Sequence, residues 1–222
     1  MRILALDTAL GACSVAVLED ERVLAHSWQA MERGHAEALA PMVEKTMQDS
    51  GIAFAALDRL AVTTGPGTFT GQRVGLAFAR GLRVALKKPL IGLTTLEVIA
   101  AAAAAESGIS CVAVIHDARR GEVYLEIVED GISVFAPIVL EAAQAAAAIA
   151  ERAGKMPLLL AGTAAAQMAE HLNAAHIKAS VSAIAQPDAL WLARLAREAT
   201  PGDAAPAPLY LRAPDAKLPA SP

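Results

Sequence analysis

The sequence predicts an α/β protein in which mixed sheets are flanked by helices. Three short strand-like segments open the chain, and helical and strand-like segments alternate after them. The second half repeats this order loosely, without a clear repeat in the sequence itself. A meander followed by alternating helices and strands is typical of a sheet with helices packed on it. We therefore expect two lobes, residues 1–106 and residues 107–222, with an irregular tail after Pro201.

Three strands, over residues 2–9, 13–20 and 22–29, open the first half because runs of apolar residues there are bounded by turn and charged residues. A helix from about His35 to Ser50 follows, since apolar residues recur there at four-residue spacing and Gly51 stops the pattern. Pro41 lies inside this pattern, and a helix that begins or bends at this residue is also compatible with it. The remaining elements of this half are a strand over 58–64, a helix to about Lys87, a strand over 89–95 and a helix over 96–107.

The second half starts with two strands joined by a turn at Arg120-Gly121. A third strand, a helix, a strand and two further helices are predicted after them; their expected bounds are 132–140, 141–153, 156–162, 165–173 and 187–199. The segment Pro208–Arg212, "PLYLR", is apolar enough to dock on the body of the protein.

Bulk composition excludes several classes of protein. The net charge is −4, whereas a protein that grips nucleic acid alone usually has a basic face. The two cysteines are far apart, which predicts neither a disulfide framework nor a zinc site. The longest apolar runs are shorter than a membrane span of about 20 residues. We expect a cytoplasmic protein that makes no contact with membranes.

The glycine-rich stretch "GPGTFTGQR", residues 65–73, raises two interpretations. As a phosphate-binding loop it fails, because Gln72 and Arg73 stand where such loops carry lysine and a hydroxyl residue. The dinucleotide pattern fails by one residue, at Thr70. Free amides at the start of a helix still attract anions, so Gly65 and Gly67 remain possible nucleotide or anion contacts.

Close packing is the better specified interpretation of these glycines. Gly71, Gly75 and Ala79 recur every four residues and form a stripe of small residues along one side of a helix. Such stripes let a second helix approach closely. Arg73, Arg80 and Lys87 recur every seven residues on another side. This second row is either a solvated cationic edge or a partner-facing surface with charge selectivity, and the sequence leaves both open.

Five segments stand out, "ILALDTALGACSVAVL", "HAEALAPMV", "GPGTFTGQRVGLA", "DARRGEVY" and "PLYLR", and together they resemble the TsaB (YeaZ) family. The segment "GPGTFTGQRVGLA" is similar to the family's GPGSFTGLRIGLA, and "HAEALAPMV" resembles its HSE-x-L-x-P segment, with Ala36 in place of serine. The segments "DARRGEVY" and "PLYLR" are similar to further motifs of the family. The likeness covers most of the chain.

The resemblance implies an actin-like ATPase (ASKHA-type) fold with two related lobes. It also implies a part in making threonylcarbamoyladenosine next to the anticodon of tRNAs that read codons beginning with A. There a TsaD-type subunit performs the transfer, a TsaE-type ATPase joins, and this chain is the dimerisation subunit, contacting tRNA only through the complex. ATP and metal would belong to the partner subunits, with no cofactor on this chain alone. The family pairs through the two helices of its first lobe, as a homodimer when alone. The partner interface would then comprise His35, Leu39, Met42, Val43, Gly71, Arg73, Gly75, Phe78, Ala79 and Leu82.

Catalytic constellations are sparse. The family's transferase holds a metal with His-x-x-x-His, and the matching positions here are Thr95 and Ile99, which are poor ligands for a transition metal. Asp7 and Thr8 end the first strand, where actin-like ATPases hold a metal–nucleotide, but Ala9 and Leu10 stand where a glycine would admit phosphate. Asp117, after His116, is a general base or the residue that orders a turn, and we favour the turn.

Three functions follow from these observations. The first is a non-catalytic interaction subunit of the tRNA-modifying complex. The second is an actin-like kinase or ATPase for a small molecule, with Asp7, Thr8 and the loop 65–71 on phosphate. The third is a module that binds tRNA directly, against which the negative charge counts.

Overall fold

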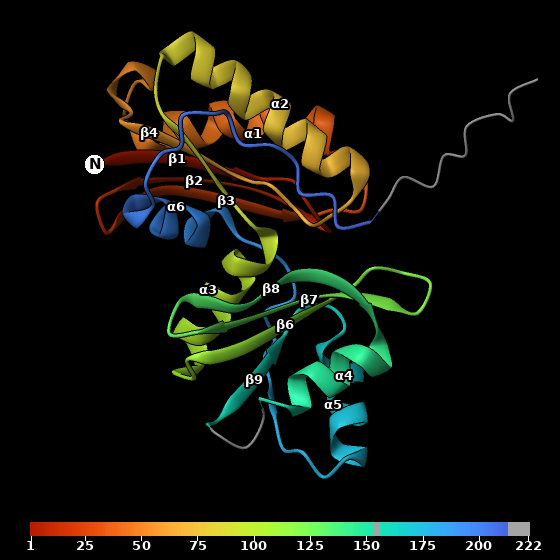
Figure 1. Ribbon diagram of the computed structural model, residues 1–222. Helices are drawn as coiled ribbons and strands as arrows, with labels where there is room; N and C mark the ends of the chain where they lie inside the picture. Colours follow the sequence, from red (N-terminus) through yellow and green to blue (C-terminus); the bar gives the residue numbers. More distant parts are fainter. Residues whose placement is uncertain (153–155, 213–222) are drawn as a thin grey trace, which may run out of the picture.

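The chain folds into two α/β lobes, each built on a five-stranded mixed sheet (Figure 1). The computed structural model describes residues 1–152 and 156–212. The first sheet has the order β3-β2-β1-β4-β5. Its strands β1, β2 and β3 are antiparallel neighbours, and β4 and β5 continue the sheet in parallel with β1. The strand bounds are β1 (Arg2–Asp7), β2 (Ala12–Glu19), β3 (Arg22–Ala30), β4 (Arg59–Thr63) and β5 (Leu90–Leu93).

The second sheet repeats this topology with the order β8-β7-β6-β9-β10. The strands β6, β7 and β8 again form an antiparallel meander, and β9 and β10 are parallel to β6. Pro137 lies in β8, which tolerates it because an edge strand has no ladder partner on one side. The bounds are β6 (Cys111–Asp117), β7 (Glu122–Glu129), β8 (Ile132–Glu141), β9 (Leu158–Ala161) and β10 (Ser180–Val181).

Helices cover both faces of the first sheet. Helices α1 (His35–Ser50) and α2 (Phe69–Leu86) pack against one face, where alternate residues of β1 and β2 such as Leu4 and Val15 point. Helix α6 (Ala189–Glu198) packs against the other face, on Ile3 and Ala16. The side-chain alternation of a strand therefore supplies both layers of the core.

The second sheet is covered in the same manner, but one of its helices comes from the other half of the chain. Helices α4 (Ala142–Ala150) and α5 (Ala165–Ala174) pack on one face. Helix α3 (Thr95–Ser107), which directly follows β5 of the first sheet, packs on the opposite face, against Val112 and Val114 of β6. The halves of the chain thus exchange their last helices: α3 lies on the second sheet and α6 lies on the first (Figure 1). Below, each lobe means a sheet with the helices packed on it.

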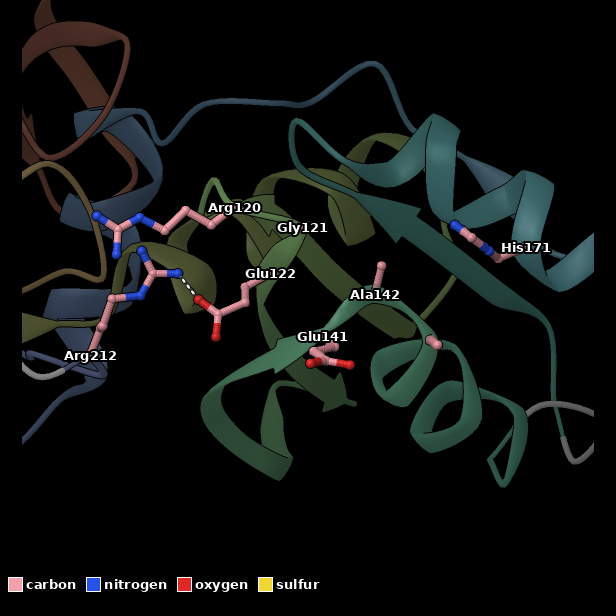
Figure 2. A pocket seen from close by; sticks show the side chains of 8 residues that line it. Arg120, Gly121, Glu122, Glu141, Ala142, His171 and Arg212 are labelled. Atoms are coloured by element: carbon pink, nitrogen blue, oxygen red, sulfur yellow. Dashed lines mark hydrogen bonds and ion pairs between the residues drawn. The ribbon is translucent and has the colours of Figure 1, made fainter.

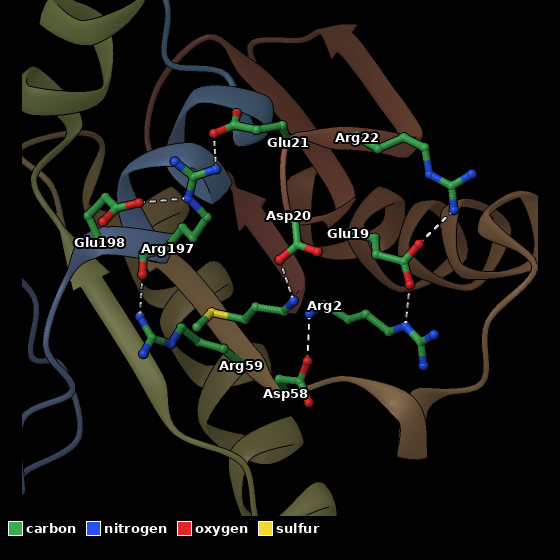
Figure 3. A network of polar contacts seen from close by, with 10 residues as sticks. Arg2, Glu19, Asp20, Glu21, Arg22, Asp58, Arg59, Arg197 and Glu198 are labelled. Carbon is green, nitrogen blue, oxygen red and sulfur yellow. Dashed lines mark hydrogen bonds and ion pairs between the residues drawn. The ribbon is translucent and has the colours of Figure 1, made fainter.

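Arg59 of β4 holds the exchanged helix α6 in place. Its guanidinium donates to the carbonyl oxygens of Ala196, Arg197 (3.2 Å) and Ala199 (2.7 Å), which are the acceptors that a helix leaves open at its C-terminus. Figure 3 shows this contact beside a set of surface ion pairs, in which Arg2 and Arg22 both reach Glu19. Helix α3 needs no such partner, because it ends at Gly108 in the left-handed conformation (φ 73°).

Most predicted elements are confirmed, with local differences. The helix over 35–50 has the expected bounds and runs through Pro41 instead of beginning there. The short strand β10 and a 3-10 turn at Phe54–Ala56 were not predicted. The chain boundary at residues 106 and 107 falls next to the end of α3, but the packing does not follow it, because α3 and α6 are exchanged.

The segment after α6 returns across the first lobe, as predicted for "PLYLR". The Leu209 amide donates to the Thr64 carbonyl at 2.8 Å, and Pro206 packs on Gly92. Residues 213–222 of the predicted irregular tail lie outside the described residues. Within residues 1–152 and 156–212, no helix is both long and apolar enough to span a membrane.

Candidate functional site

The predicted small-residue stripe of α2 faces the chain's own sheet. A Cβ atom on Gly71 would lie 2.1 Å from the carbonyl oxygen of Thr8, and one on Gly75 would lie 2.6 Å from Oγ1 of Thr8. Thr8 also donates from Oγ1 to the Gly71 carbonyl at 2.7 Å. These contacts account for both glycines without any neighbouring molecule. The interpretation that the stripe admits a partner helix is therefore wrong.

Six of the ten predicted interface residues are buried inside the chain. His35 donates from Nε2 to the Leu10 carbonyl at 3.0 Å, and Leu39 and Val43 lie in the core of the first lobe. Gly71 and Gly75 are buried as described above, and Ala79 is 1% exposed in the same core. These six cannot be touched by a partner in this conformation. The other four stay a prediction, since they are at least partly exposed: Met42, Arg73, Phe78 and Leu82.

The outer surface of α2 carries a second stripe of small residues. Ala77, Gly81 and Ala85 are exposed and recur every four residues, and a Cβ on Gly81 would meet no atom within 4 Å. Beside them lies a row of half-buried apolar residues, which packs partly on the core: Val74, Phe78 and Leu82. Helix α1 lies next to α2 and adds the half-buried Met42. We call these residues of α1 and α2 the outer α1–α2 surface.

Sequence reasoning missed the outer stripe although its spacing is the same as that of the inner one. The signal was present in the sequence, since small residues occur at 71, 75, 79 and also at 77, 81, 85. The periodicity alone could not tell which stripe faces the sheet.

The arginine row of α2 contacts the returning C-terminal segment. Arg73 donates from Nε to Oη of Tyr210 at 2.8 Å, and its guanidinium lies 3.2 Å from the centre of the Phe69 ring. Arg80 donates to the Pro206 carbonyl, from Nε at 3.0 Å. The sequence offered a solvated edge or a partner surface for this row, and the structure adds an intramolecular contact that neither alternative included.

A cleft of about 740 Å³ separates the two lobes. Gly67 lines it, but the other three predicted nucleotide contacts do not. Asp7 and Thr8 are 0% and 1% exposed, and Gly65 is buried over the Gln72 side chain. The lining side chains with polar or charged groups are Glu32, Arg33, Thr68, His116, Asp117, Arg119, Tyr124, Thr163, Gln186 and Arg212.

Asp7 is enclosed by its own lobe. Its Oδ1 accepts from the Thr63 hydroxyl and from the Ala9 amide (3.2 Å), while Oδ2 is buried without a partner among the described residues. Burial raises the pKa of this carboxyl to about 7, although the hydrogen bond from Thr63 opposes the shift. The nearby Cys13 thiol, also buried, has its pKa raised to about 12. A carboxyl that is fully buried and has a pKa of about 7 is poorly placed to hold a metal–nucleotide.

The turn between β6 and β7 is ordered by Asp117, as predicted. Its Oδ1 accepts from the Arg119 amide at 2.7 Å. Arg119 and Arg120 both have positive φ, 64° and 60°. His116 shares a hydrogen bond between Nδ1 and Oγ1 of Thr163 at 3.1 Å, and burial lowers the pKa of this histidine to about 4. His116 is therefore neutral at physiological pH, lining the cleft.

A second cavity, of about 720 Å³, lies on the far side of this turn. Figure 2 shows Arg120 extending from the turn towards Arg212, whose guanidinium is joined to Glu122. Arg212 also donates to the Ala118 carbonyl at 3.0 Å. Glu141 and His171 lie farther along the second lobe than the paired Arg212 and Glu122 (Figure 2).

The start of α3 contains the positions that match the metal-binding histidines of the family's transferase. Thr95 and Ile99 are both fully buried, and Oγ1 of Thr95 has no hydrogen-bond partner in the described part of the chain. Over the described ranges, no group of three or more His, Cys, Asp and Glu side chains is arranged to hold a metal ion.

Glu126 of β7 is a buried carboxyl at the junction between the lobes. Its Oε2 accepts from the Thr94 hydroxyl at 3.1 Å, and Thr94 caps the start of α3 together with Glu97. Ser133 also bonds to Glu126. Burial raises the pKa of Glu126 to about 7, and the nearby Glu97 adds to the shift. Sequence reasoning did not single out this residue, because one acidic residue in a strand pattern carries no signal of burial.

Comparisons of the sequence with known proteins find relatives of this chain. A family model described as TsaD, tRNA N6-adenosine threonylcarbamoyltransferase, matches residues 28–217. The Escherichia coli protein named tRNA threonylcarbamoyladenosine biosynthesis protein TsaB is 43% identical over 124 residues, which cover 56% of this chain and 53% of that protein. The Bacillus subtilis protein of the same name is 33% identical over similar shares. The matched region spans about half the length of these curated relatives.

Solved structures extend the likeness to nearly the whole chain. A Pseudomonas aeruginosa protein, described as uncharacterised and similar to peptidase YeaZ, has a TM-score of 0.81 and 30% identity. The match covers 95% of this chain and 99% of that one. Component A of the Acidaminococcus fermentans (R)-2-hydroxyglutaryl-CoA dehydratase has a TM-score of 0.54 at 12% identity, a likeness of fold alone.

Proposed function

This chain belongs to the TsaB (YeaZ) family and has its actin-like, two-lobed fold, and from that premise we propose that it is a non-catalytic dimerisation and activating subunit. Its complex would add threonylcarbamoyl to the adenosine beside the anticodon of tRNAs that read codons beginning with A. The names of the curated relatives support a part in threonylcarbamoyladenosine synthesis. The transfer itself would belong to a TsaD-type subunit.

The outer α1–α2 surface is the observation that carries this proposal. The small residues Ala77, Gly81 and Ala85 leave the backbone of α2 open to close approach, and the half-buried Phe78 and Leu82 lie beside them. Surfaces that combine small residues with apolar neighbours allow helices to pack at short distance. A TsaD-type subunit would pack here, and a second copy of this chain would do so when that partner is absent.

The interior of the first lobe supports a role without chemistry of its own. In actin-like ATPases the end of the first strand holds a metal–nucleotide, but here Asp7 is buried and bonded to Thr63, and Thr8 is buried against Gly71 and Gly75 of α2. ATP and metal would therefore act on partner subunits, a TsaD-type transferase and a TsaE-type ATPase. Contact with tRNA would pass through the complex, which we place in the cytoplasm.

A single exposed glycine gives the direct test. Gly81→Gln adds a bulky, neutral, helix-compatible side chain where no atom lies within 4 Å, so the chain should fold as before. We expect it to lose association with a TsaD-type subunit and self-association in analytical ultracentrifugation. Ala166→Gln, at an exposed position of α5 in the second lobe, is the matched control. Normal association of the Gly81→Gln chain would refute the proposed surface.

The rival function, an actin-like kinase or ATPase, has a separate test. Calorimetry of the isolated chain with ATP and magnesium would show tight binding and turnover if the rival were correct. The enclosed Asp7, whose carboxyl is bonded to Thr63, argues against that result.

A further inference from the structure

One side of α2, together with its C-terminal cap residue Lys87, carries four cationic residues that have no carboxylate partner among the described residues. Arg73, Arg80, Arg83 and Lys87 lie on neighbouring turns of the helix, and over residues 1–152 and 156–212 no ion pair joins any of them to an acidic side chain. Other arginines of the chain differ, since Arg2, Arg22, Arg197 and Arg212 each meet a glutamate (Figure 3 shows the first three). We call the four residues of α2 the arginine ridge.

Neutral acceptors hold the three arginines of the ridge instead. They belong to residues 203–210, which we call the strap. Arg83 donates to the Asp203 carbonyl at 3.3 Å, Arg80 to the Pro206 carbonyl at 3.0 Å and Arg73 to the Tyr210 hydroxyl at 2.8 Å. The strap therefore runs antiparallel to α2, as an extended polypeptide laid along the cations.

The charges of the arginine ridge remain uncompensated in this arrangement. A carbonyl or hydroxyl oxygen neutralises no charge, whereas hydrogen bonds from a guanidinium to a carboxylate are shorter and roughly twice as strong. Arg73, Arg80 and Lys87 are also exposed, so that a second molecule can reach them. The chain as a whole carries a net charge of −4, which makes this row a local exception.

We propose that the arginine ridge is a docking surface for an extended, acidic segment of a partner protein that takes the place of the strap. The strap already shows that an extended polypeptide fits along α2 with its acceptors at the arginines. Carboxylates in place of these carbonyl and hydroxyl oxygens would supply the negative charge that the three acceptors lack, although the strap itself includes Asp203, which meets Arg83 through its carbonyl. The ridge lies on the same helix as the outer α1–α2 surface, on a different side, so one partner could occupy both.

An RNA strand would bring phosphates to the same cations, and the exposed rings of Phe69 (60% exposed) and Tyr210 (48% exposed) could stack on bases. The net negative charge of the chain opposes a long polyanion more than a short acidic segment. A polypeptide already occupying the site also favours a peptide. RNA is therefore the competing outcome of the test.

The test uses the full chain and a fluorescein-labelled (Glu-Ala)5 peptide, with binding followed by fluorescence anisotropy at low salt. Arg80→Gln and, separately, Arg83→Gln should each weaken binding about tenfold, because each removes one charge-assisted interaction. Tyr210→Ala should strengthen binding by loosening the strap. Arg22→Gln, which removes an exposed arginine elsewhere in the first lobe, is the matched control and should change nothing.

Three results would overturn the proposal. The first is equal binding by the wild-type and both arginine variants. The second is equal binding of an uncharged (Gln-Ala)5 peptide. The third is tighter binding of a uridine decamer through the same arginines, which would assign the ridge to RNA.

The inference rests on the proposed function only in taking the partner to be a protein of the complex. The peptide assay needs no partner subunit. If the acidic peptide does not bind but the chain still forms its complex, only the proposal for the arginine ridge is refuted. If the peptide binds normally and the Gly81→Gln chain still forms its complex, only the proposed outer α1–α2 surface is refuted.

Discussion

The two lobes share a strand order but differ in their outer helices. Helices α1 and α2 of the first lobe have 16 and 18 residues, whereas α4 and α5, which occupy the same places on the second sheet, have 9 and 10. Short helices suffice to cover a five-stranded sheet, as the second lobe demonstrates. The longer pair of the first lobe therefore offers surface beyond what its own core requires, and both proposed docking surfaces lie on it.

The first turn of each sheet differs in a second way. Between β1 and β2 the turn has no charged residue after Asp7, and its Ala9 is buried under the loop that precedes α2. Between β6 and β7 the corresponding turn is charged and holds Arg119 and Arg120 at positive φ. The same sheet topology thus carries a sealed turn in the first lobe and an open, cationic turn in the second. Topology alone therefore does not predict where a functional site lies.

The sealed turn is most sharply tested by adding one methyl group to α2. Gly71→Ala would place Cβ 2.1 Å from the Thr8 carbonyl, and backbone cannot move aside without shifting β1. We expect a loss of about 3 kcal/mol in the free energy of unfolding, near the upper end for overpacking. Urea denaturation followed by tryptophan fluorescence measures it, because Trp28 and Trp191 both belong to the first lobe.

Gly81→Ala is the matched control for that experiment, since it makes the same change on the outer side of the same helix. It should stabilise the chain by about 0.5–1 kcal/mol, because alanine is the better helix former and meets no neighbour. Equal effects at Gly71 and Gly81 would contradict the assignment of the two faces of α2.

The next largest effect concerns two buried carboxyls of the described residues, Asp7 in the first lobe and Glu126 in the second. The native pKa of Glu126, about 7, lies above its ordinary value of 4.5. Its contribution to stability is therefore complete below about pH 4.5 and is lost as the pH rises through 7. Through this carboxyl, the free energy of unfolding of the wild type should fall by roughly 2–3 kcal/mol between pH 5 and pH 8. In Glu126→Gln this part of the decrease should be absent. Denaturation at both values measures this.

Asp7 is left intact in the Glu126→Gln chain, and its pKa is likewise raised to about 7. A smaller decrease of stability with pH should therefore persist in that variant. If the variant lost stability with pH as steeply as the wild type, Glu126 would not be the buried acid that titrates.

The smallest of the three effects concerns how the exchanged helices end. Arg59→Ala would leave the last carbonyls of α6 without a donor, at a cost of about 1–2 kcal/mol. Faster amide hydrogen exchange confined to the end of α6 would reveal it. Arg22→Ala, which breaks an exposed pair with Glu19, should leave the stability almost unchanged, because solvent screens such pairs. Unchanged exchange in α6 would show that Arg59 does not secure the helix.

Local structure was largely predictable because it depends on short-range patterns. Periodic apolar residues and stopping glycines located α1, and the motif at residues 65–73 located the start of α2. Longer-range relations were not predictable. An apolar helix such as α3 does not encode which sheet it will cover, and the stripe of Gly71 and Gly75 does not encode whether a strand or a partner lies opposite.

The strap illustrates the same limit. "PLYLR" was expected to dock, yet nothing in the sequence relates Tyr210 to Arg73, which lies 137 residues earlier. Likewise, the sequence places Asp7 at the end of a strand, where actin-like ATPases hold a metal–nucleotide, and only the fold shows that its carboxyl is buried and bonded to Thr63.

The exchange of α3 and α6 means that the polypeptide passes between the lobes twice, once between β5 and α3 and once before α6. Two attachment points define an axis. We therefore expect the lobes to move relative to one another by bending about the line through these crossings and not by free twisting. A protease cut in either crossing would leave fragments that remain interlocked.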